Sequence, residues 1–117
     1  MEIEFKKNFN LENRINQCRT LLENNKDSIP VILYKDKNCT IDLVKSKFLV
    51  KKTTKINEFS SKVRRSLKIE KEKGLFFCVH GYMAITGDKP MEQIYNLYKD
   101  KEDGFLYILV STELVFG

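Results

Sequence analysis

The chain has 117 residues, of which 42% are hydrophobic and 32% are charged, and its net charge is +5 at pH 7. These values are typical of one globular domain and exclude a disordered chain. No apolar run reaches the length of about 18 residues that a membrane-spanning helix needs, and the sequence predicts no secretory signal. The positive charge favours anionic partners, namely acidic peptides, membrane surfaces or nucleic acid.

Three cysteines, Cys18, Cys39 and Cys78, lack the spacing of a metal site. We interpret them as free thiols of a protein in a reducing compartment, the cytosol or the nucleus. His80 is the one histidine, and no set of residues has the spacing of a catalytic triad. The sequence therefore predicts a protein that is not an enzyme and that holds no metal or cofactor.

Residues 1–25 are predicted to be helical, because apolar side chains recur at the spacing of one helix face. These side chains are Leu11, Ile15, Cys18 and Leu22. Asn10 is suited to cap this helix at its N-terminus. Ahead of it, Ile3, Phe5 and Phe9 predict either a short further helix or an extended arm.

Two strands are predicted next, over 29–34 and 47–50, and the short polar turn between them favours an antiparallel pair. Pro30 is expected near a strand start or at a sheet edge, where its missing N–H costs least. The brief apolar patch at 41–44 is assigned to neither strand.

The second half predicts a helix over 56–67, with Thr54 as its N-cap. A strand over 75–79 is apolar throughout, so we expect it near the centre of the sheet. A loop over 81–88 and a shorter helix over 91–98 follow.

The C-terminal stretch organises the rest of the chain. An Asp-Gly step precedes a strand over 105–110, and its nearly continuous apolar run predicts burial on both faces in the middle of the sheet. The sequence then ends at Phe116-Gly117. Glycine lacks a Cβ, so its carboxylate can enter a narrow channel of another enzyme. A terminal glycine can also be a frayed end.

The predicted order is two strands, a helix, a strand, a second helix and a last strand, after the N-terminal helices. One sheet with the main helix across one face is an α+β solution. We expect a single domain over 1–117, with N-terminal helices over 1–25, a core over 28–112 and a flexible tail over 113–117.

Basic residues cluster between positions 45 and 68, where nine Lys or Arg stand against one Glu. This stretch is either a solvated face or a docking surface for acidic ligands. Nucleic acid is disfavoured, because the aromatic residues lie in the runs predicted to be buried. The strand over 47–50 either accepts an extended peptide at a sheet edge or carries lysines that guard this edge against aggregation.

Short motifs occur along the chain in one order and at near-constant spacing: Arg14, Ile29-Pro30-Val31-Ile32, Lys47-Phe48-Leu49-Val50, Phe59, Val63-Arg64, Phe76-Phe77 with Val79, Met91-x-x-Ile94-Tyr95, Asp103-Gly104-Phe105-Leu106-Tyr107 and Phe116-Gly117. From about Phe9 to Gly117, the chain resembles the autophagy ubiquitin-like modifiers of the GABARAP and microtubule-associated light-chain-three group. The resemblance implies a ubiquitin-like β-grasp fold, with a four-stranded mixed sheet, a helix packed on one face and a helical N-terminal extension.

The resemblance also implies conjugation through Gly117, with Phe116 presented beside it. An activating enzyme adenylates the glycine carboxylate with ATP, a conjugating enzyme receives it as a thioester, and phosphatidylethanolamine takes it as an amide. A deconjugating cysteine protease is a further implied partner. Precursors in the family carry residues after this glycine, so the sequence is either a processed form or the product of a gene that ends there.

The family binds cargo receptors that carry aromatic-x-x-aliphatic motifs, by strand addition. The implied aromatic pocket is formed by Leu21, Pro30, Ile32, Lys47, Leu49 and Phe105. The implied aliphatic pocket is formed by Phe48, Val50, Phe59 and Val63. The implied contacts to acidic residues of the ligand come from Lys47, Lys51 and Arg64.

Five positions depart from the family pattern. Lys51 replaces a usual proline, Thr54 an apolar residue, Lys62 an aliphatic residue, Ser28 a basic residue and Gln17 an acid. We therefore predict that the aliphatic pocket is more polar than is usual and that acidic residues in the motif matter more.

The leading hypothesis is a lipid-conjugated modifier, cytoplasmic when free and on autophagosomal or related membranes when lipidated. One alternative is a protein-conjugated relative of the autophagy-twelve type. Another is a β-grasp peptide-binding module that is never conjugated. A nucleic-acid binder is the least favoured class.

Overall fold

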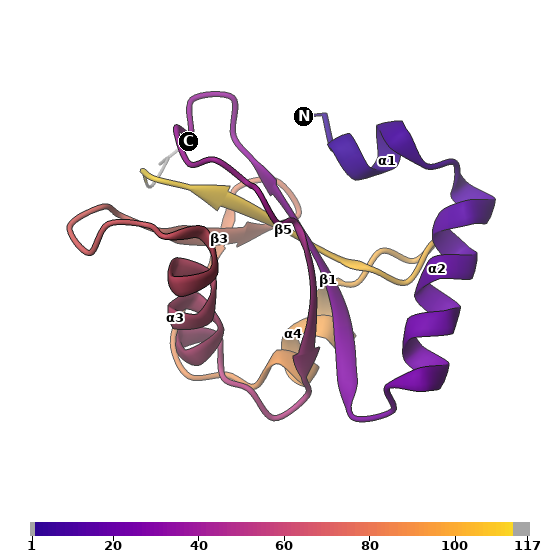
Figure 1. Cartoon of the computed structure of the whole chain (residues 1–117). Helices are drawn as coiled ribbons and strands as arrows, with labels where there is room; N and C mark the ends of the chain where they lie inside the picture. The colour runs from indigo at the N-terminus through magenta and orange to yellow at the C-terminus, as the bar shows by residue number, and fades with distance from the viewer. Residues whose placement is uncertain (1, 114–117) are drawn as a thin grey trace.

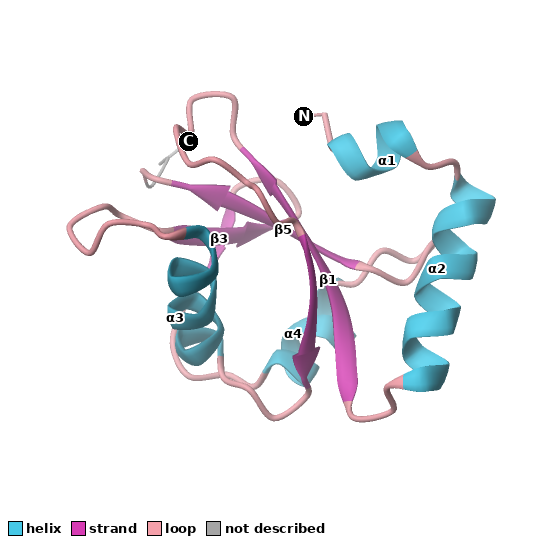
Figure 2. Cartoon of the chain, in the orientation of Figure 1, coloured by secondary structure: helices cyan, strands magenta, loops and turns pink. Residues whose placement is uncertain are grey.

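The computed structural model describes residues 2–113, which form one five-stranded sheet with helices on both faces (Figure 1). Helices α1 (Glu4–Asn8) and α2 (Leu11–Asn24) cover one face, and α3 (Ile56–Leu67) and α4 (Met91–Tyr98) cover the other. Figure 2 distinguishes the helices from the strands, which are β1 (Ser28–Lys35), β2 (Lys47–Lys51), β3 (Phe76–Val79), β4 (Met83–Ile85) and β5 (Leu106–Ser111). None of the helices within residues 2–113 has the length and apolarity to span a bilayer.

The strands are ordered β2-β1-β5-β3-β4, so β5 occupies the centre of the sheet. It pairs in parallel with β1 and antiparallel with β3. All six residues of β5 are buried, which confirms the prediction from its continuous apolar run. A strand in this position must be apolar on both faces, because helices pack against each of them.

The two faces of the sheet carry separate cores. The main core lies under α3 and α4, where Phe59 and Val63 of α3 are fully buried. The smaller core lies under α1 and α2 and is built from Phe5, Cys18, Ile32, Phe105 and Tyr107. Side chains of β1 alternate between the two cores, with Val31 in the first and Ile32 in the second.

Pro30 lies in an inner strand, yet its missing N–H leaves no gap in the sheet. Leu33 N–H donates to the Ser46 carbonyl across the β1–β2 ladder at 2.8 Å. Because such pairs alternate along antiparallel strands, the Pro30 nitrogen faces away from β2. On that other side, pairing with β5 begins only at Val31. The proline therefore sits where no ladder bond is required of it.

Several element predictions are confirmed and three are wrong. Asn10 caps α2, since its Oδ1 accepts from Asn13 N–H at 2.9 Å, and the segment ahead of it forms the short helix α1. Thr54 is not the cap of α3. The N-cap of α3 is Lys55, whose N–H donates to Glu58 Oε1 at 3.0 Å. The Thr54 carbonyl instead accepts from Met91 N–H.

The sheet has five strands rather than the predicted four, because residues within the expected loop 81–88 form β4. Strand β4 pairs with one side of β3, so β3 lies next to an edge and not at the centre. Met83 and Ala84 are exposed, which explains why β4 lacks the apolar pattern of a buried strand.

Candidate functional site

Strand β2 forms one edge of the sheet. Hydrogen-bonded pairs alternate in its antiparallel ladder with β1, and Leu33–Ser46 is one such pair. Phe48 and Val50 therefore direct their backbone groups towards β1, while Lys47 and Leu49 direct theirs outwards. These outward N–H and carbonyl groups are the pattern that an added peptide strand uses.

The side chains of β2 also alternate. Phe48 and Val50 point into the main core, and Lys47, Leu49 and Lys51 point to the side of the sheet that carries α2. Leu49 is partly exposed and the two lysines are exposed. A strand added beside β2 would thus meet two lysines and one leucine on this face.

A groove of about 470 Å³ lies between α2 and β2, lined by Asn13, Asn16, Gln17, Thr20, Leu21 and Lys47. Lys47 Nζ donates to Gln17 Oε1 at 2.9 Å across this space. The sequence prediction did not include Asn13, Asn16 and Thr20 of α2, which line this groove together with Gln17. Their positions, 13, 16, 17 and 20, follow the spacing of one helix face, so helical periodicity applied to polar residues would have found them.

The structure brings the six predicted aromatic-pocket residues to one side of the sheet. Ile32 and Phe105 are fully buried in the smaller core, and Leu21 packs against it. Pro30 is buried beside them, whereas Lys47 and Leu49 reach the surface. Of the six, Leu21 and Lys47 line the α2–β2 groove, and Ile32 and Phe105 lie beneath the surface. The aromatic pocket therefore stays a prediction.

The four predicted aliphatic-pocket residues also lie together, but as part of the main core. Phe48, Val50, Phe59 and Val63 are each at most 2% exposed. The rings of Phe48 and Phe59 meet edge to face, with centroids 5.8 Å apart. An aliphatic ligand side chain could reach these residues only if α3 moved away from β2, so this pocket stays a prediction.

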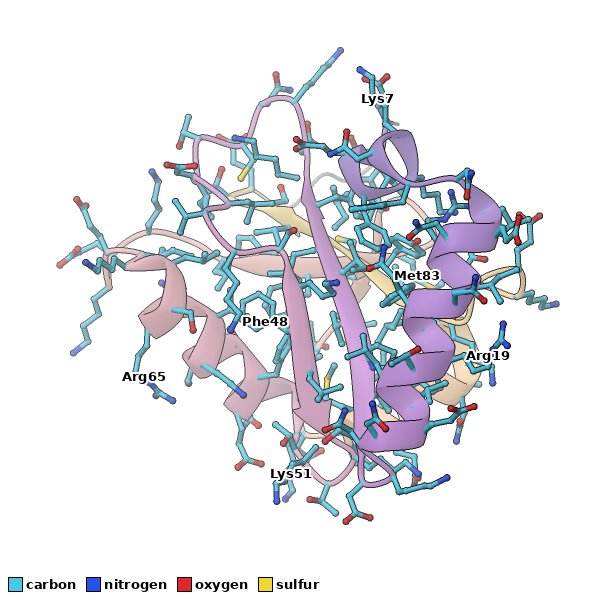
Figure 3. The ribbon with its side chains drawn as sticks, turned by 45° about the vertical axis from the view of Figure 1, so that its right-hand side comes forward. Lys7, Arg19, Phe48, Lys51, Arg65 and Met83 are labelled. Atoms are coloured by element: carbon cyan, nitrogen blue, oxygen red, sulfur yellow. The ribbon has the colours of Figure 1, made fainter. Side chains whose placement is uncertain are left out.

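The predicted contacts for acidic ligand residues are spread over two elements. Lys47 and Lys51 lie at the two ends of β2, and Figure 3 shows Lys51 at the end away from α1. Arg64 lies on α3, and its Nη1 donates to the Glu70 carbonyl at 3.1 Å. Only the two lysines are placed to meet a peptide along the β2 edge.

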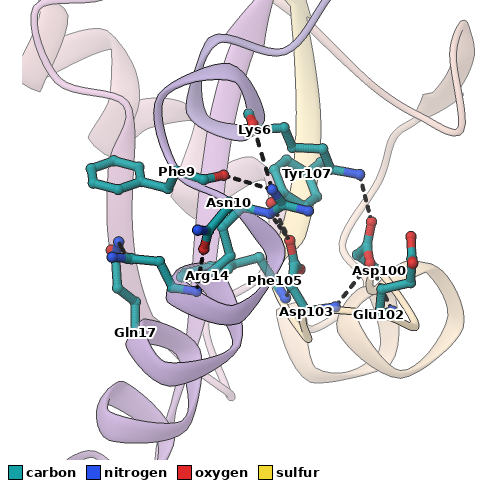
Figure 4. A network of polar contacts seen from close by, with 11 residues as sticks. Lys6, Phe9, Asn10, Arg14, Gln17, Asp100, Glu102, Asp103, Phe105 and Tyr107 are labelled. Carbon is teal, nitrogen blue, oxygen red and sulfur yellow. Dashed lines mark hydrogen bonds and ion pairs between the residues drawn. The ribbon is translucent and has the colours of Figure 1, made fainter.

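A buried ion pair attaches the N-terminal helices to the sheet (Figure 4). Arg14 Nε of α2 donates to Asp103 Oδ2 at 2.9 Å, and Arg14 Nη1 donates to the Phe9 carbonyl at 2.7 Å. Tyr107 of β5 donates its hydroxyl to the same Asp103 oxygen. Burial, together with this hydrogen bond, raises the pKa of Tyr107. The network fixes α2 against β5 and so fixes one wall of the α2–β2 groove.

A second ion pair secures α1. Lys6 Nζ lies 2.7 Å from Asp100 Oδ2 and 4.6 Å from the centre of the Tyr107 ring. Burial opposes ionisation of Asp100, but hydrogen bonds from Lys6 and from the N–H groups of Asp103 and Glu102 hold its pKa below the ordinary value. The short helix α1 is thereby held over the smaller core, where Phe5 packs on Phe105.

A second groove, of about 500 Å³, lies between α1 and the ends of β1 and β2. It shares Lys47 with the α2–β2 groove, and its lining includes three carboxylates, those of Glu2, Glu4 and Asp42. No local pattern predicts this groove, because α1 and the loop after β1 are brought together only in three dimensions.

Residues 2–113 contain no group of His, Cys, Asp and Glu arranged to hold a metal ion. The thiols of Cys18, Cys39 and Cys78 are all free and buried. His80 is exposed, and its ring meets the Tyr98 ring edge to face, with the two ring centroids 5.3 Å apart. The predicted conjugation residues Phe116 and Gly117 lie outside the described residues, as does the predicted tail beyond Glu113.

Comparison with known proteins decides the family. Residues 13–117 match the family model described as autophagy protein Atg8, ubiquitin like. The chain belongs to the Atg8 family. Autophagy-related protein 8 of Schizosaccharomyces pombe is 35% identical to it over 100% of this chain and 96% of the relative. Autophagy-related protein 8h of Arabidopsis thaliana is 33% identical over 97% and 94% of the two chains.

A solved structure supports the same assignment. The crystal structure of Trypanosoma brucei ATG8 superposes with a TM-score of 0.90 at 31% identity, and the match covers 100% of both chains. The ubiquitin-like α+β fold with N-terminal helices, predicted from the resemblance, is thus confirmed. As a member of the Atg8 family, the chain is a ubiquitin-like protein of autophagy.

Proposed function

We propose that this Atg8-family chain is conjugated through Gly117 to phosphatidylethanolamine and recruits cargo receptors to autophagosomal membranes. In the activating step, the Gly117 carboxylate attacks ATP and forms an acyl adenylate with release of pyrophosphate. A cysteine thiolate of the activating enzyme then displaces AMP, and the thioester passes to a cysteine of the conjugating enzyme. The lipid amine attacks this thioester, which yields an amide and returns the thiol.

The match of the family model through residue 117 supports this role for the glycine. So does the position of β5, whose hydrogen bonds to β1 and β3 hold the segment before the tail in the centre of the sheet. The protein contributes the carboxylate and docking surfaces, while its enzyme partners contribute the catalytic groups. The free chain is then cytoplasmic, and the lipidated chain resides on the membrane.

The observation that carries the receptor-binding part is the outward backbone edge of Lys47 and Leu49 beside the α2–β2 groove. An extended receptor segment would pair with this edge, and its aromatic side chain would enter the α2–β2 groove beside Leu21 and Lys47. Acidic residues of the same segment would meet Lys47 and Lys51. The aliphatic residue would bind towards α3, where Phe48 and Val63 are now buried.

The test is reconstitution with the activating and conjugating enzymes, ATP and vesicles that contain phosphatidylethanolamine, followed by intact mass measurement. We expect a mass gain of one lipid that requires ATP and is absent from a chain without Gly117. A related modifier in the same mixture controls for active enzymes. If only that modifier gains mass, the chain is either protein-conjugated, as in the autophagy-twelve type, or a binding module that is never conjugated.

A further inference from the structure

The positive charge of the chain is concentrated in one segment of the sequence. Residues 45–73, which include β2, α3 and the turn after α3, contain eleven Lys or Arg and three Glu, a net charge of +8. The whole chain carries +5, so the remaining residues together carry a net negative charge. Such asymmetry creates a field that orients the molecule near an anionic surface.

Part of this charge lies apart from the β2 edge. We define the α3–turn patch as the five basic side chains on the last half of α3 and the turn that follows: Lys62, Arg65, Lys68, Lys71 and Lys73. All five are exposed. The four ion pairs formed within residues 2–113 all involve other residues. These five cations are therefore available to an external anion.

The helix geometry explains why the patch faces outwards. Phe59, Val63 and Leu67 of α3 are buried in the main core, so Lys62 and Arg65, which lie between them in sequence, share the opposite face. In Figure 3, Arg65 on α3 and Arg19 on α2 point to opposite sides of the molecule. The patch thus lies on the far side of the sheet from the α2–β2 groove.

The turn that carries the patch lies beside the end of β5. Phe76 pairs with Ser111, and a Cβ added to Gly74 would lie 2.9 Å from the Thr112 carbonyl oxygen. Figure 1 shows the α3–β3 turn and the end of β5 on the same side of the molecule. Gly117 is five residues beyond Thr112, and five residues span at most ~18 Å. A lipid attached to Gly117 would therefore bring the membrane close to this turn.

We propose that the α3–turn patch binds the headgroups of anionic lipids and sets how the anchored molecule is oriented on the membrane. The orienting role rests on the proposed conjugation at Gly117, while binding to anionic vesicles does not. A membrane is favoured over an acidic peptide, because the cations are spread over a helix end and a projecting turn, which lies beside the end of β5. Acidic peptide residues bound along β2 would instead meet Lys47 and Lys51.

The expected strength follows from surface electrostatics. Each Lys or Arg that reaches a membrane rich in anionic lipid strengthens binding about fivefold. Attraction decays over a Debye length of about 10 Å at 0.1 M salt. Binding should therefore be weak, dependent on anionic lipid and lost at high salt. After conjugation, the two acyl chains supply the anchoring, and the patch fixes which face is turned to the membrane.

The first experiment uses the unconjugated full chain and vesicles of phosphatidylcholine, with and without phosphatidylserine, in sedimentation assays. The test variant combines Arg65→Gln, Lys71→Gln and Lys73→Gln. The matched control combines Lys7→Gln, Lys26→Gln and Lys101→Gln, which removes the same charge from exposed sites elsewhere. We expect the test variant to lose partitioning by about 10- to 100-fold and the control by less than about threefold.

A second experiment supplies the anchor without any enzyme. A Gly117→Cys chain is coupled to a maleimide lipid, since the three native thiols are buried. Hydrogen exchange is then compared on vesicles with and without phosphatidylserine. We expect slower exchange of the backbone amides over 68–74 on the anionic vesicles, and no such change in the test variant.

Three outcomes would overturn the proposal: no binding of the wild-type chain to anionic vesicles at low salt, equal losses in the test and control variants, or binding of a polyglutamate peptide through these residues without vesicle binding. The last outcome would assign the patch to an acidic protein partner. Because neither experiment uses the conjugation enzymes, failure here leaves the proposed conjugation standing, and failed conjugation leaves this result unaffected.

Discussion

Gly104 lies where α2 approaches the turn before β5. Its φ is +87°, and an added Cβ would lie 2.9 Å from Cys18 Sγ. Gly87 has a similar φ of +92°, but no atom lies within 4 Å of the position that its Cβ would take. Alanine substitutions at the two glycines therefore distinguish the backbone cost of a left-handed conformation, which both share, from the cost of a steric clash, which only position 104 has.

We predict that Gly104→Ala lowers the free energy of unfolding by about 2–3 kcal/mol and Gly87→Ala by about 1 kcal/mol. The difference arises because the alanine methyl group at 104 displaces the buried Cys18 side chain. Urea denaturation of both variants measures it. Adding Cys18→Ala to Gly104→Ala should recover part of the loss. Equal losses at the two glycines would contradict this explanation.

Asp100 links stability to pH. Its pKa is lowered in the folded state, from an ordinary value of 3.8, by hydrogen bonds that outweigh the effect of burial. A lowered pKa means that the carboxylate stabilises the fold above its unfolded-state pKa. This stabilisation is lost as the pH falls towards the folded-state pKa, where the carboxylate is protonated.

We therefore expect wild type to lose stability more steeply than Asp100→Asn as the pH falls below about 4, by at most about 1.4 kcal/mol per pH unit. The variant is less stable than wild type near neutral pH, and the two converge in acid. Urea denaturation at several pH values measures the slopes. Asp88→Asn, at an exposed position, is the control for the loss of one negative charge. Parallel slopes for all three proteins would refute the assignment.

Individual contacts in these sites were partly predictable from the sequence. Helical periodicity and capping chemistry located α2 and its cap Asn10, because both are local properties. The pairing of Arg14 with Asp103 joins residues 89 positions apart, and no local pattern specifies it. Arg14 and Asp103 stand in separate motifs of the sequence, and only the folded chain shows that they share one hydrogen-bond network with Tyr107.

At the scale of elements, β2 and β4 are the two edges of the sheet, yet only β2 was predicted from its apolar pattern. Phe48 and Val50 fill the main core, so β2 must alternate between buried and exposed residues. Strand β4 has two exposed residues and one partly buried residue, so it forms through pairing with β3 rather than through its own burial. Composition alone cannot reveal such a strand.

Substitutions near the β2 edge test whether this chain has an unusual preference among receptor motifs. Lys51 N–H faces away from β1, so a proline there removes no ladder bond. We expect Lys51→Pro combined with Lys62→Leu to bind aromatic-x-x-aliphatic peptides about tenfold more tightly than wild type. The change at 62 adds apolar surface to α3, towards which the aliphatic residue would bind, and the change at 51 supplies the proline that the family pattern has there. Isothermal titration with one unmodified peptide measures this.

The control for this prediction combines Lys7→Leu with Lys101→Leu, at two exposed positions away from β2. It changes the net charge by the same amount as the double variant. The control should leave peptide affinity within about twofold of wild type. A gain in the control as large as in the double variant would assign the effect to charge. No gain in either would show that these lysines do not set motif preference.

At the scale of the whole molecule, one sheet separates two cores and two proposed binding regions. The β2 edge lies at one side of the sheet, with β1 between it and β5, the strand that leads to Gly117. The α3–turn patch and the α2–β2 groove lie on opposite faces. A lipidated chain oriented through the patch would therefore leave the groove open to receptors in solution.

This arrangement predicts that receptor binding and conjugation can be lost separately. Leu49→Pro removes an outward N–H at the β2 edge without removing a bond to β1, so we expect receptor peptides to bind at least tenfold more weakly, a cost of about 1.4 kcal/mol. Conjugation should proceed as in wild type. Deletion of Gly117 should have the opposite effects. Leu49→Ala, which keeps the N–H, separates the backbone contribution from that of the side chain. Loss of conjugation in Leu49→Pro, with its folding verified by circular dichroism, would mean that the enzymes also dock on the β2 edge and that the two regions are not independent.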